Sequence, residues 1–166
     1  MLVLTFMTDF VKITLATDRV RPSQSPDTWE IRSTTLVALS LGFCMMFEAL
    51  GLLWLGLHIV GIKLESHEVH TYSFLILLFM ALFSILSIRE RGHFWKSRPS
   101  KTLALALFLD GVVGLLIGWK GIGDLPPLKV SAIGIAFFGA VFLSLGLNDV
   151  LKLIFNKMIP KVLIKS

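Results

Sequence analysis

The chain has little charge and a single cysteine. Of its 166 residues, 16% are charged and 55% are hydrophobic, and its mean hydropathy is +0.80. A soluble domain of this size has too little interior to bury so much apolar surface. One cysteine, Cys44, excludes an internal disulfide. The composition therefore predicts a protein whose solvent is partly lipid.

The sequence also lacks a nucleophile–base pair, a Cys/His metal cluster and a Walker-type loop. The histidines of HEVH, His67 and His70, are three positions apart, whereas a zincin helix needs four; we expect a solvated outer loop there. GWKGIG at 118–123 has the wrong glycine order for a phosphate-binding loop, and no strand precedes it, so we predict a helix end. No catalytic residue and no metal ligand is predicted.

Four apolar runs are long enough to cross a bilayer, whose core of about 30 Å requires about 20 helical residues. None of them alternates in polarity as the strands of a membrane barrel do. A fifth run, at 2–16, is too short for a full span at about 1.5 Å per residue. The sequence therefore predicts an all-α polytopic bundle, in which a truncated helix precedes four full transmembrane helices at 34–61, 71–88, 102–119 and 130–155.

The basic residues are distributed unevenly between the connections. Alternate connections carry twelve Lys and Arg residues on one side of the membrane and three on the other. The positive-inside rule then places 17–33, 89–101 and the C-terminus in the cytoplasm. This topology explains the net charge of +5 better than a nucleic-acid partner does. RERGHFWKSRPSK, at 89–101, is interpreted mainly as a topology determinant, with contact to anionic headgroups as the alternative.

We single out three acids inside the apolar runs as candidate sites: Asp9, Glu48 and Asp110. Each costs about 2.5–3.5 kcal/mol at the bilayer centre, so such residues are usually functional or paired inside the bundle. Gly114 and Gly118 share a helical face with Asp110, which predicts that this face packs inward. For Asp110 and Glu48, a functional site and a protonated acid with a purely structural role both remain open.

Asp9 has a basic neighbour, Lys12, within side-chain reach on a helix. One interpretation is an internal ion pair that lowers the pKa of the aspartate. The other is that Lys12 extends to the cytoplasmic interface and leaves Asp9 alone deeper in the membrane. The second is favoured, because Lys12 is nearer the cytoplasmic end of the run.

Two segments resemble a known family. TDFVKITLATDRVRPSQSPDTW, at 8–29, resembles the sixth transmembrane helix and following cytoplasmic loop of type III P-type ATPases, the proton-pumping group. The family pattern has a mid-membrane aspartate, a D-R-V-basic-P-S segment and a P-D-x-W tail. RERGHFWKSRPS, at 89–100, resembles the loop between helices eight and nine. The sequence departs from the plant and fungal pattern at Thr8, Phe10 and Lys12.

The resemblance implies that Asp9 takes up and releases the transported proton. It divides the chain into a truncated ion-binding helix (1–16), a cytoplasmic loop (17–33) and a four-helix membrane region (34–166). Together these parts would correspond to helices six to ten of a plasma-membrane pump. From their positions in the apolar runs, and not from the resemblance, Lys12, Glu48 and Asp110 are the candidate intramembrane partners. We expect the chain to begin within helix six.

The same resemblance implies that ATP and Mg are bound by domains this sequence lacks, including a D-K-T-G-T phosphorylation loop. No cofactor is expected in this chain, which would be inactive alone. Its partners would be the lipid bilayer, the N-terminal part of the ATPase and the proton. The alternative function is a free-standing membrane scaffold or regulatory subunit that packs against a complete transporter. A small membrane enzyme using Asp110, Glu48 and the outer histidines is the least favoured hypothesis.

Overall fold

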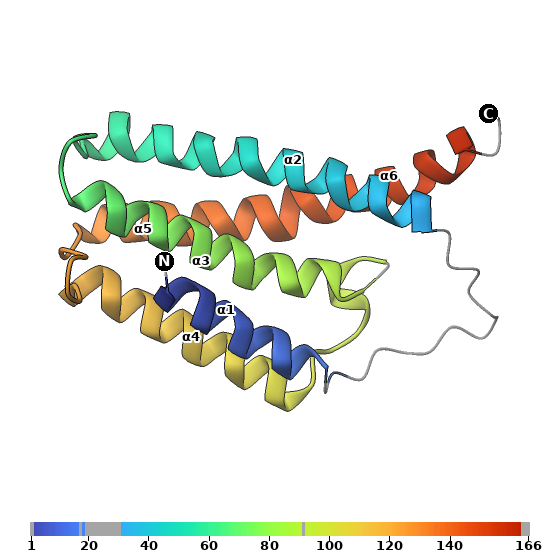
Figure 1. Cartoon of the computed structure of the whole chain (residues 1–166), viewed down its shortest axis with the longest axis horizontal. Helices are drawn as coiled ribbons and strands as arrows, with labels where there is room; N and C mark the ends of the chain where they lie inside the picture. The colour runs from blue at the N-terminus through green and yellow to red at the C-terminus, as the bar shows by residue number, and fades with distance from the viewer. Residues whose placement is uncertain (1, 17, 19–30, 91, 164–166) are drawn as a thin grey trace.

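The structure is a computed structural model that describes residues 2–16, 18, 31–90 and 92–163. These residues form a bundle of helices (Figure 1), and the one β-type contact among them is an isolated bridge between Ile122 and Leu125. The predicted all-α bundle is confirmed. The elements are α1 (Leu2–Leu15), α2 (Ile31–Leu55), the π-helix η1 (Gly56–Val60), α3 (Glu68–Ile88), the 3-10 turn η2 (Phe94–Lys96), α4 (Lys101–Lys120), α5 (Val130–Val141), the π-helix η3 (Phe142–Leu147) and α6 (Asn148–Leu163).

Four helices in the described part are long and apolar enough to cross a membrane: Thr34–Val60, Glu68–Ile88, Lys101–Lys120 and Val130–Met158. The first joins α2 to η1, and the last joins α5, η3 and α6. The short α1 precedes them, as predicted. The predicted loop at 17–33 lies outside the described residues, apart from Asp18 and the start of α2.

The prediction that HEVH lies in a loop is wrong for three of its four residues. Helix α3 begins at Glu68 and includes His70, with His67 at its N-cap. A glutamate in the first turn is stabilised by the positive end of the helix dipole, which explains the earlier start. The predicted helix end at 118–123 is confirmed, because α4 ends at Lys120 and Gly121 follows with a positive φ of 73°.

Helix α3 occupies the centre of the bundle, with α2 on one side and α1 and α4 on the other (Figure 1). Its residues Tyr72, Leu75 and Phe79 are fully buried. A helix that is apolar on every side is expected in such a position. The outer helices expose large apolar side chains, for example Phe47 on α2 and Phe108 on α4, as a lipid-facing surface requires.

Candidate functional site

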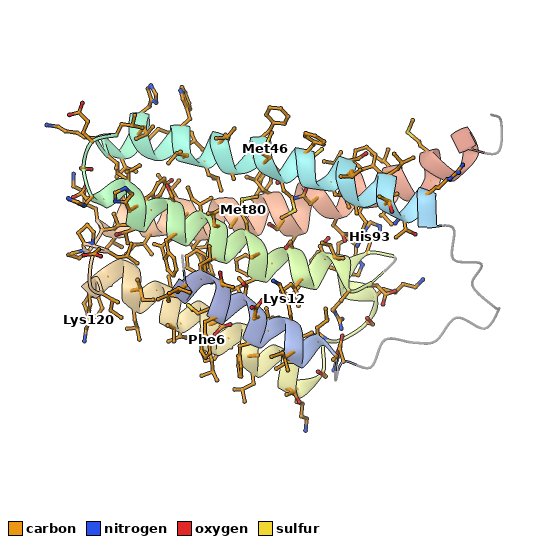
Figure 2. The ribbon with its side chains drawn as sticks, in the orientation of Figure 1. Phe6, Lys12, Met46, Met80, His93 and Lys120 are labelled. Atoms are coloured by element: carbon orange, nitrogen blue, oxygen red, sulfur yellow. The ribbon has the colours of Figure 1, made fainter. Side chains whose placement is uncertain are left out.

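The first candidate site is the charged pair on α1. Lys12 Nζ lies 3.0 Å from Asp9 Oδ1, and the two side chains are 62% and 53% exposed. The structure therefore has the ion pair and not the snorkelling arrangement that the position of Lys12 favoured. Met7 and Val11 are buried on the face of α1 that packs on α3 and α4. The charged pair belongs to the face that the described residues leave uncovered, together with the exposed Phe6 (Figure 2).

The C-terminal end of α1 is tied to the connection between α3 and α4. Asp18 Oδ2 accepts a hydrogen bond from Arg89 Nη1 at 2.8 Å, and Asp18 Oδ1 accepts one from the Ser100 backbone N–H at 2.7 Å. The Asp18 and Arg89 side chains are each 1% exposed. Arg89 also donates to the carbonyl and the hydroxyl of Ser97. This contact fixes the position of α1 along the bundle.

That attachment sets the depth of Asp9. Asp9 lies six residues before the end of α1 at Leu15, and a helix rises about 1.5 Å per residue, so Asp9 lies roughly 9 Å along α1 from that end. A bilayer core is about 30 Å thick. Because α1 runs beside α4 (Figure 1), Asp9 lies within the apolar layer that the four long helices define.

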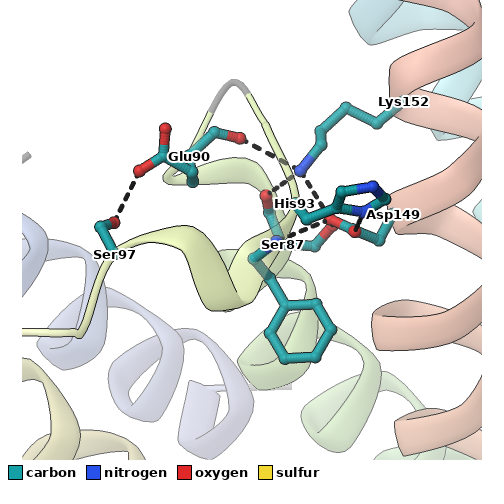
Figure 3. A network of polar contacts seen from close by, with 7 residues as sticks. Ser87, Glu90, His93, Ser97, Asp149 and Lys152 are labelled. Atoms are coloured by element: carbon teal, nitrogen blue, oxygen red, sulfur yellow. Dashed lines mark hydrogen bonds and ion pairs between the residues drawn. The ribbon is translucent and has the colours of Figure 1, made fainter.

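A second polar cluster joins α6 to the end of α3, and Asp149 is at its centre (Figure 3). Asp149, 1% exposed, pairs with Lys152 Nζ at 2.7 Å and with His93 Nδ1 at 2.9 Å. Its Oδ1 also accepts hydrogen bonds from the Ser87 hydroxyl and the Phe94 backbone N–H. The carboxylate is thus fully surrounded by donors, as a buried charge requires.

Lys152 completes this cluster. Its ammonium donates to the carbonyls of Ser87 at 2.6 Å and Glu90 at 3.1 Å, in addition to Asp149. The carbonyls at a helix C-terminus lack intrahelical partners, and a cation there satisfies them and complements the helix dipole. Lys152 therefore stabilises the end of α3 from the neighbouring α6.

Sequence reasoning missed this cluster. Asp149 lies within the apolar run at 130–155 but is not among the three predicted intramembrane acids, and Lys152 enters the prediction only as one of the twelve basic residues on the cytoplasmic side. The sequence signal for this contact is that Asp149 and Lys152 are three positions apart, like Asp9 and Lys12, which places the two side chains within reach on a helix. The segment 89–101 also has a structural role that the sequence did not indicate, because Arg89 pairs with the buried Asp18 and His93 pairs with the buried Asp149.

Two carboxyls of these clusters lie outside the membrane-spanning helices, and both have shifted pKa values. Burial raises the pKa of Asp18, but hydrogen bonds from Ser100 and Arg89, together with the charge of Arg89, outweigh it and hold this pKa below 3.8. For Glu90, the Ser97 hydroxyl donates to Oε2 at 2.6 Å and is the main reason that the pKa lies below 4.5. Both groups are therefore anionic at neutral pH.

The third candidate is Glu48. Its Oε2 accepts a hydrogen bond from Asn148 Nδ2 at 2.7 Å, which connects α2 to the first residue of α6. Glu48 Oε1 and Asn148 Oδ1 are buried and have no partner among the described residues. The sequence pointed to Glu48 but not to its partner, which is 100 positions away.

Asp110 lies on the inner face of α4. It is 7% exposed, and its Oδ2 is buried without a hydrogen-bond partner among the described residues. The prediction that this face packs inward is confirmed, because a Cβ at Gly114 would lie 2.5 Å from Leu78 Cδ2 and one at Gly118 would lie 2.7 Å from Leu75 Cδ1. The glycines let α4 approach α3 closely.

The structure does not combine the predicted intramembrane acids into one site. Asp9, Glu48 and Asp110 are on three different helices, and no hydrogen bond or ion pair of the described residues joins any two of them. Nor do those residues hold a group of three His, Cys, Asp or Glu side chains arranged to bind a metal ion. No known protein-family model matches the chain.

Proposed function

We propose that this chain is the carboxyl-terminal membrane portion of a proton-transporting P-type ATPase of type III, and that Asp9 carries the transported proton. In this proposal the chain resides in the plasma membrane with its C-terminus in the cytoplasm. ATP and Mg are bound by other segments of the pump, and the chain is inactive without them. The sequence support is the resemblance at 8–29 and 89–100.

The observation that carries the proposal is the uncovered charged face of α1. Asp9 and Lys12 are more than half exposed on a helix that packs beside the long apolar helices, and ionised groups facing lipid are costly. Charged intramembrane residues almost always face a bundle interior or a water-filled cavity. The uncovered face therefore fits a surface against which further helices of the same pump pack, with Asp9 at the junction.

The Asp18–Arg89 contact adds support, because it joins the two segments that carry the resemblance. Asp18 belongs to the D-R-V-R-P-S match, and Arg89 and Ser100 are the ends of the second match. The two segments that resemble the same family therefore also contact each other in the fold.

The chemistry of Asp9 suits proton transport. A carboxyl that moves between dry and hydrated surroundings changes its proton affinity, so that binding and release can alternate. Lys12 Nζ, 3.0 Å away, supplies a fixed positive charge. This charge disfavours a metal ion bound at Asp9 more than a proton, because the metal ion keeps its positive charge beside Lys12, whereas a proton only neutralises the carboxylate.

The partner is tested by site-specific photo-crosslinking in native membranes. A photoreactive residue at Phe6, on the uncovered face of α1, is compared with one at Phe108, which is similarly exposed on α4. Capture of a polypeptide containing D-K-T-G-T from Phe6 but not from Phe108 is expected. Capture of a complete ATPase by a stable 18.5 kDa chain would support the scaffold alternative, and a chain of that mass with no partner would refute both.

The role of Asp9 is tested in the assembled pump. Asp9→Asn removes the titratable group but keeps the size of the side chain, so ATP-driven acidification of vesicles should fall to background. Asp9→Glu should retain part of it, because a carboxyl remains. Full transport by the Asp9→Asn pump would contradict the assignment.

A further inference from the structure

Helices α2 and α6 meet at a contact between a carboxyl and a primary amide in the interior of the bundle. Glu48 is near the middle of the span Thr34–Val60, and Asn148 follows η3 within the span Val130–Met158. The Asn148 side-chain N–H group donates to Glu48 Oε2 at 2.7 Å. Asn148 is 4% exposed. Glu48 is half-buried, but its Oε1 is buried, so the contact lies at membrane depth and the unpaired oxygens are away from solvent.

The second half of this contact is unsatisfied. Glu48 Oε1 and Asn148 Oδ1 are both buried without a partner among the described residues. An ionised carboxylate and an amide oxygen are both acceptors, so neither can satisfy the other. A buried acceptor without a donor is strongly unfavourable. The pair lacks one donor, and a single donor placed between these two oxygens would satisfy both.

The neighbouring groups do not supply that donor. Lys152, one turn along α6, already uses its three N–H groups on the Ser87 and Glu90 carbonyls and on Asp149. On α3, the Ser84 hydroxyl donates to the Ala81 carbonyl.

Three further groups lie along the helices that form the contact. Ser144 of η3 is buried, and its hydroxyl donates to neither oxygen of the pair, since it makes no hydrogen bond within the described part of the chain. Cys44, a free cysteine, lies one turn before Glu48 on α2. Asp149 is a hydrogen-bond acceptor that is already paired with Lys152. Glu48 also has no cationic partner among the ion pairs of the described residues.

We propose that Glu48 and Asn148 form a buried proton-binding site, in which one proton on Glu48 Oε1 closes a two-bond ring with the amide. The carboxylate takes the proton from a hydronium ion of the solvent, which leaves as water, and becomes neutral. Its O–H group then donates to Asn148 Oδ1, while Asn148 Nδ2–H continues to donate to Oε2. Both unsatisfied oxygens gain a bond, and the uncompensated intramembrane charge disappears.

This site couples proton binding to the packing of α2 on α6. The π-helix η3 ends immediately before Asn148, and a π-turn rotates the residues that follow it relative to a regular helix. Such turns are frequent at functional positions. When the proton leaves, a carboxylate without a cation remains between the two helices, and their contact loosens. The site is separate from Asp9 and does not depend on the proposed pump function.

The test is infrared spectroscopy of the full chain in lipid nanodiscs, with glutamate labelled by ¹³C at the side-chain carboxyl. A protonated carboxyl has a C=O stretching band distinct from carboxylate bands, and the label identifies it as glutamate. We expect this band at about pH 7, where an ordinary glutamate is ionised. It should be absent in Glu48→Gln and unchanged in Asp110→Asn, the matched control.

A second measurement separates proton binding from a merely structural glutamate. Glu48→Gln keeps the ring, because its amide N–H donates to Asn148 Oδ1, so its unfolding midpoint should stay near that of the native chain. Asn148→Leu removes the ring and should lower the midpoint and shift the glutamate band. Absence of the glutamate band in the native chain would overturn the proposal. A band that disappears when sodium or potassium is added would overturn it too, since that identifies a metal-cation site.

Discussion

The carboxylate of Asp18 and the guanidinium of Arg89 lie 2.8 Å apart, with 1% of each side chain exposed. They are 71 positions apart in the chain and join the end of α1 to the end of α3. Removing one member of such a pair destabilises the fold strongly, because the other is then a buried charge without a counter-ion. This contact therefore holds α1 in the bundle.

Replacing Arg89 with Met should destabilise the chain by about 3–5 kcal/mol, the usual cost of breaking a buried ion pair from one side. The double variant Asp18→Asn/Arg89→Met should recover much of this loss, because no charge remains buried. Equilibrium unfolding in mixed micelles measures both. Arg98→Met, at an exposed position of the same loop, should change the stability by less than about 0.5 kcal/mol. Additive effects of the two single substitutions would contradict the pairing.

Acid should weaken the same end of the bundle. The pKa values of Asp18 and Glu90 are both lowered in the folded protein, from 3.8 and 4.5. A lowered pKa stabilises the fold above the unfolded value, and that stabilisation is lost as the pH falls through the folded value. The unfolding midpoint should therefore be level down to about pH 5 and fall below it. Asp18→Asn should make the fall shallower, and an identical acid profile for this variant would argue against the assignment.

The helices were predictable because they depend on composition. A run such as 102–119 is recognisable from length and hydropathy alone, and α4 occurs at Lys101–Lys120. The inward face of Asp110 and Gly114 was also predictable, because the helical period fixes which side chains share a face. The early start of α3 was missed, since a single glutamate at a helix N-terminus is a weaker signal than the polar appearance of HEVH.

The polar contacts were much less predictable. Asn148 lies 100 positions from Glu48 and Arg89 lies 71 from Asp18, so no local pattern connects either pair. They form because burial leaves each charge or amide only the few partners that tertiary packing brings close. Lys152 was interpreted as a topology charge because a lysine near a helix end usually lies in the headgroup region, and only the fold shows that it caps α3.

Lys152→Met should be among the most destabilising single substitutions of a charged residue, by about 3–5 kcal/mol, because it leaves Asp149 buried and two carbonyls without a donor. Lys157→Met, five residues further along α6 at an exposed position, is the matched control and should have little effect. Hydrogen exchange at the end of α3 reports the same contact locally, and amides near Ser87 should lose protection only in Lys152→Met. Equal behaviour of the two variants would exclude the capping role.

The π-helix η1 depends on a glycine beneath an aromatic ring. A Cβ at Gly56 would lie 2.1 Å from Tyr72 Cε1, and the ring cannot move aside easily, because it is buried and its hydroxyl donates to the Leu52 carbonyl at 3.0 Å. Gly56→Ala should therefore cost about 1–3 kcal/mol, as overpacking usually does. Gly51→Ala has nothing within 4 Å of the new Cβ and should be neutral or stabilising by up to about 1 kcal/mol. Thermal unfolding of the two variants compares them directly, and equal stabilities would show that Tyr72 adapts.

The charges of α1 should determine how readily this helix enters a bilayer. Asp9 and Lys12 pair at 3.0 Å on a face that the described residues leave uncovered, and each ionised group costs about 2.5–3.5 kcal/mol at the bilayer centre. Insertion measured by glycosylation mapping should therefore improve most in Asp9→Leu/Lys12→Leu. Lys12→Leu alone should improve it by less than half as much, because Asp9 then loses its counter-ion. If Lys12→Leu alone improved insertion as much as the double substitution, the two side chains would not pair in the membrane. Because the same double substitution should abolish proton transport in a complete pump, better insertion with lost transport would show that the charges on α1 serve function at the expense of membrane insertion.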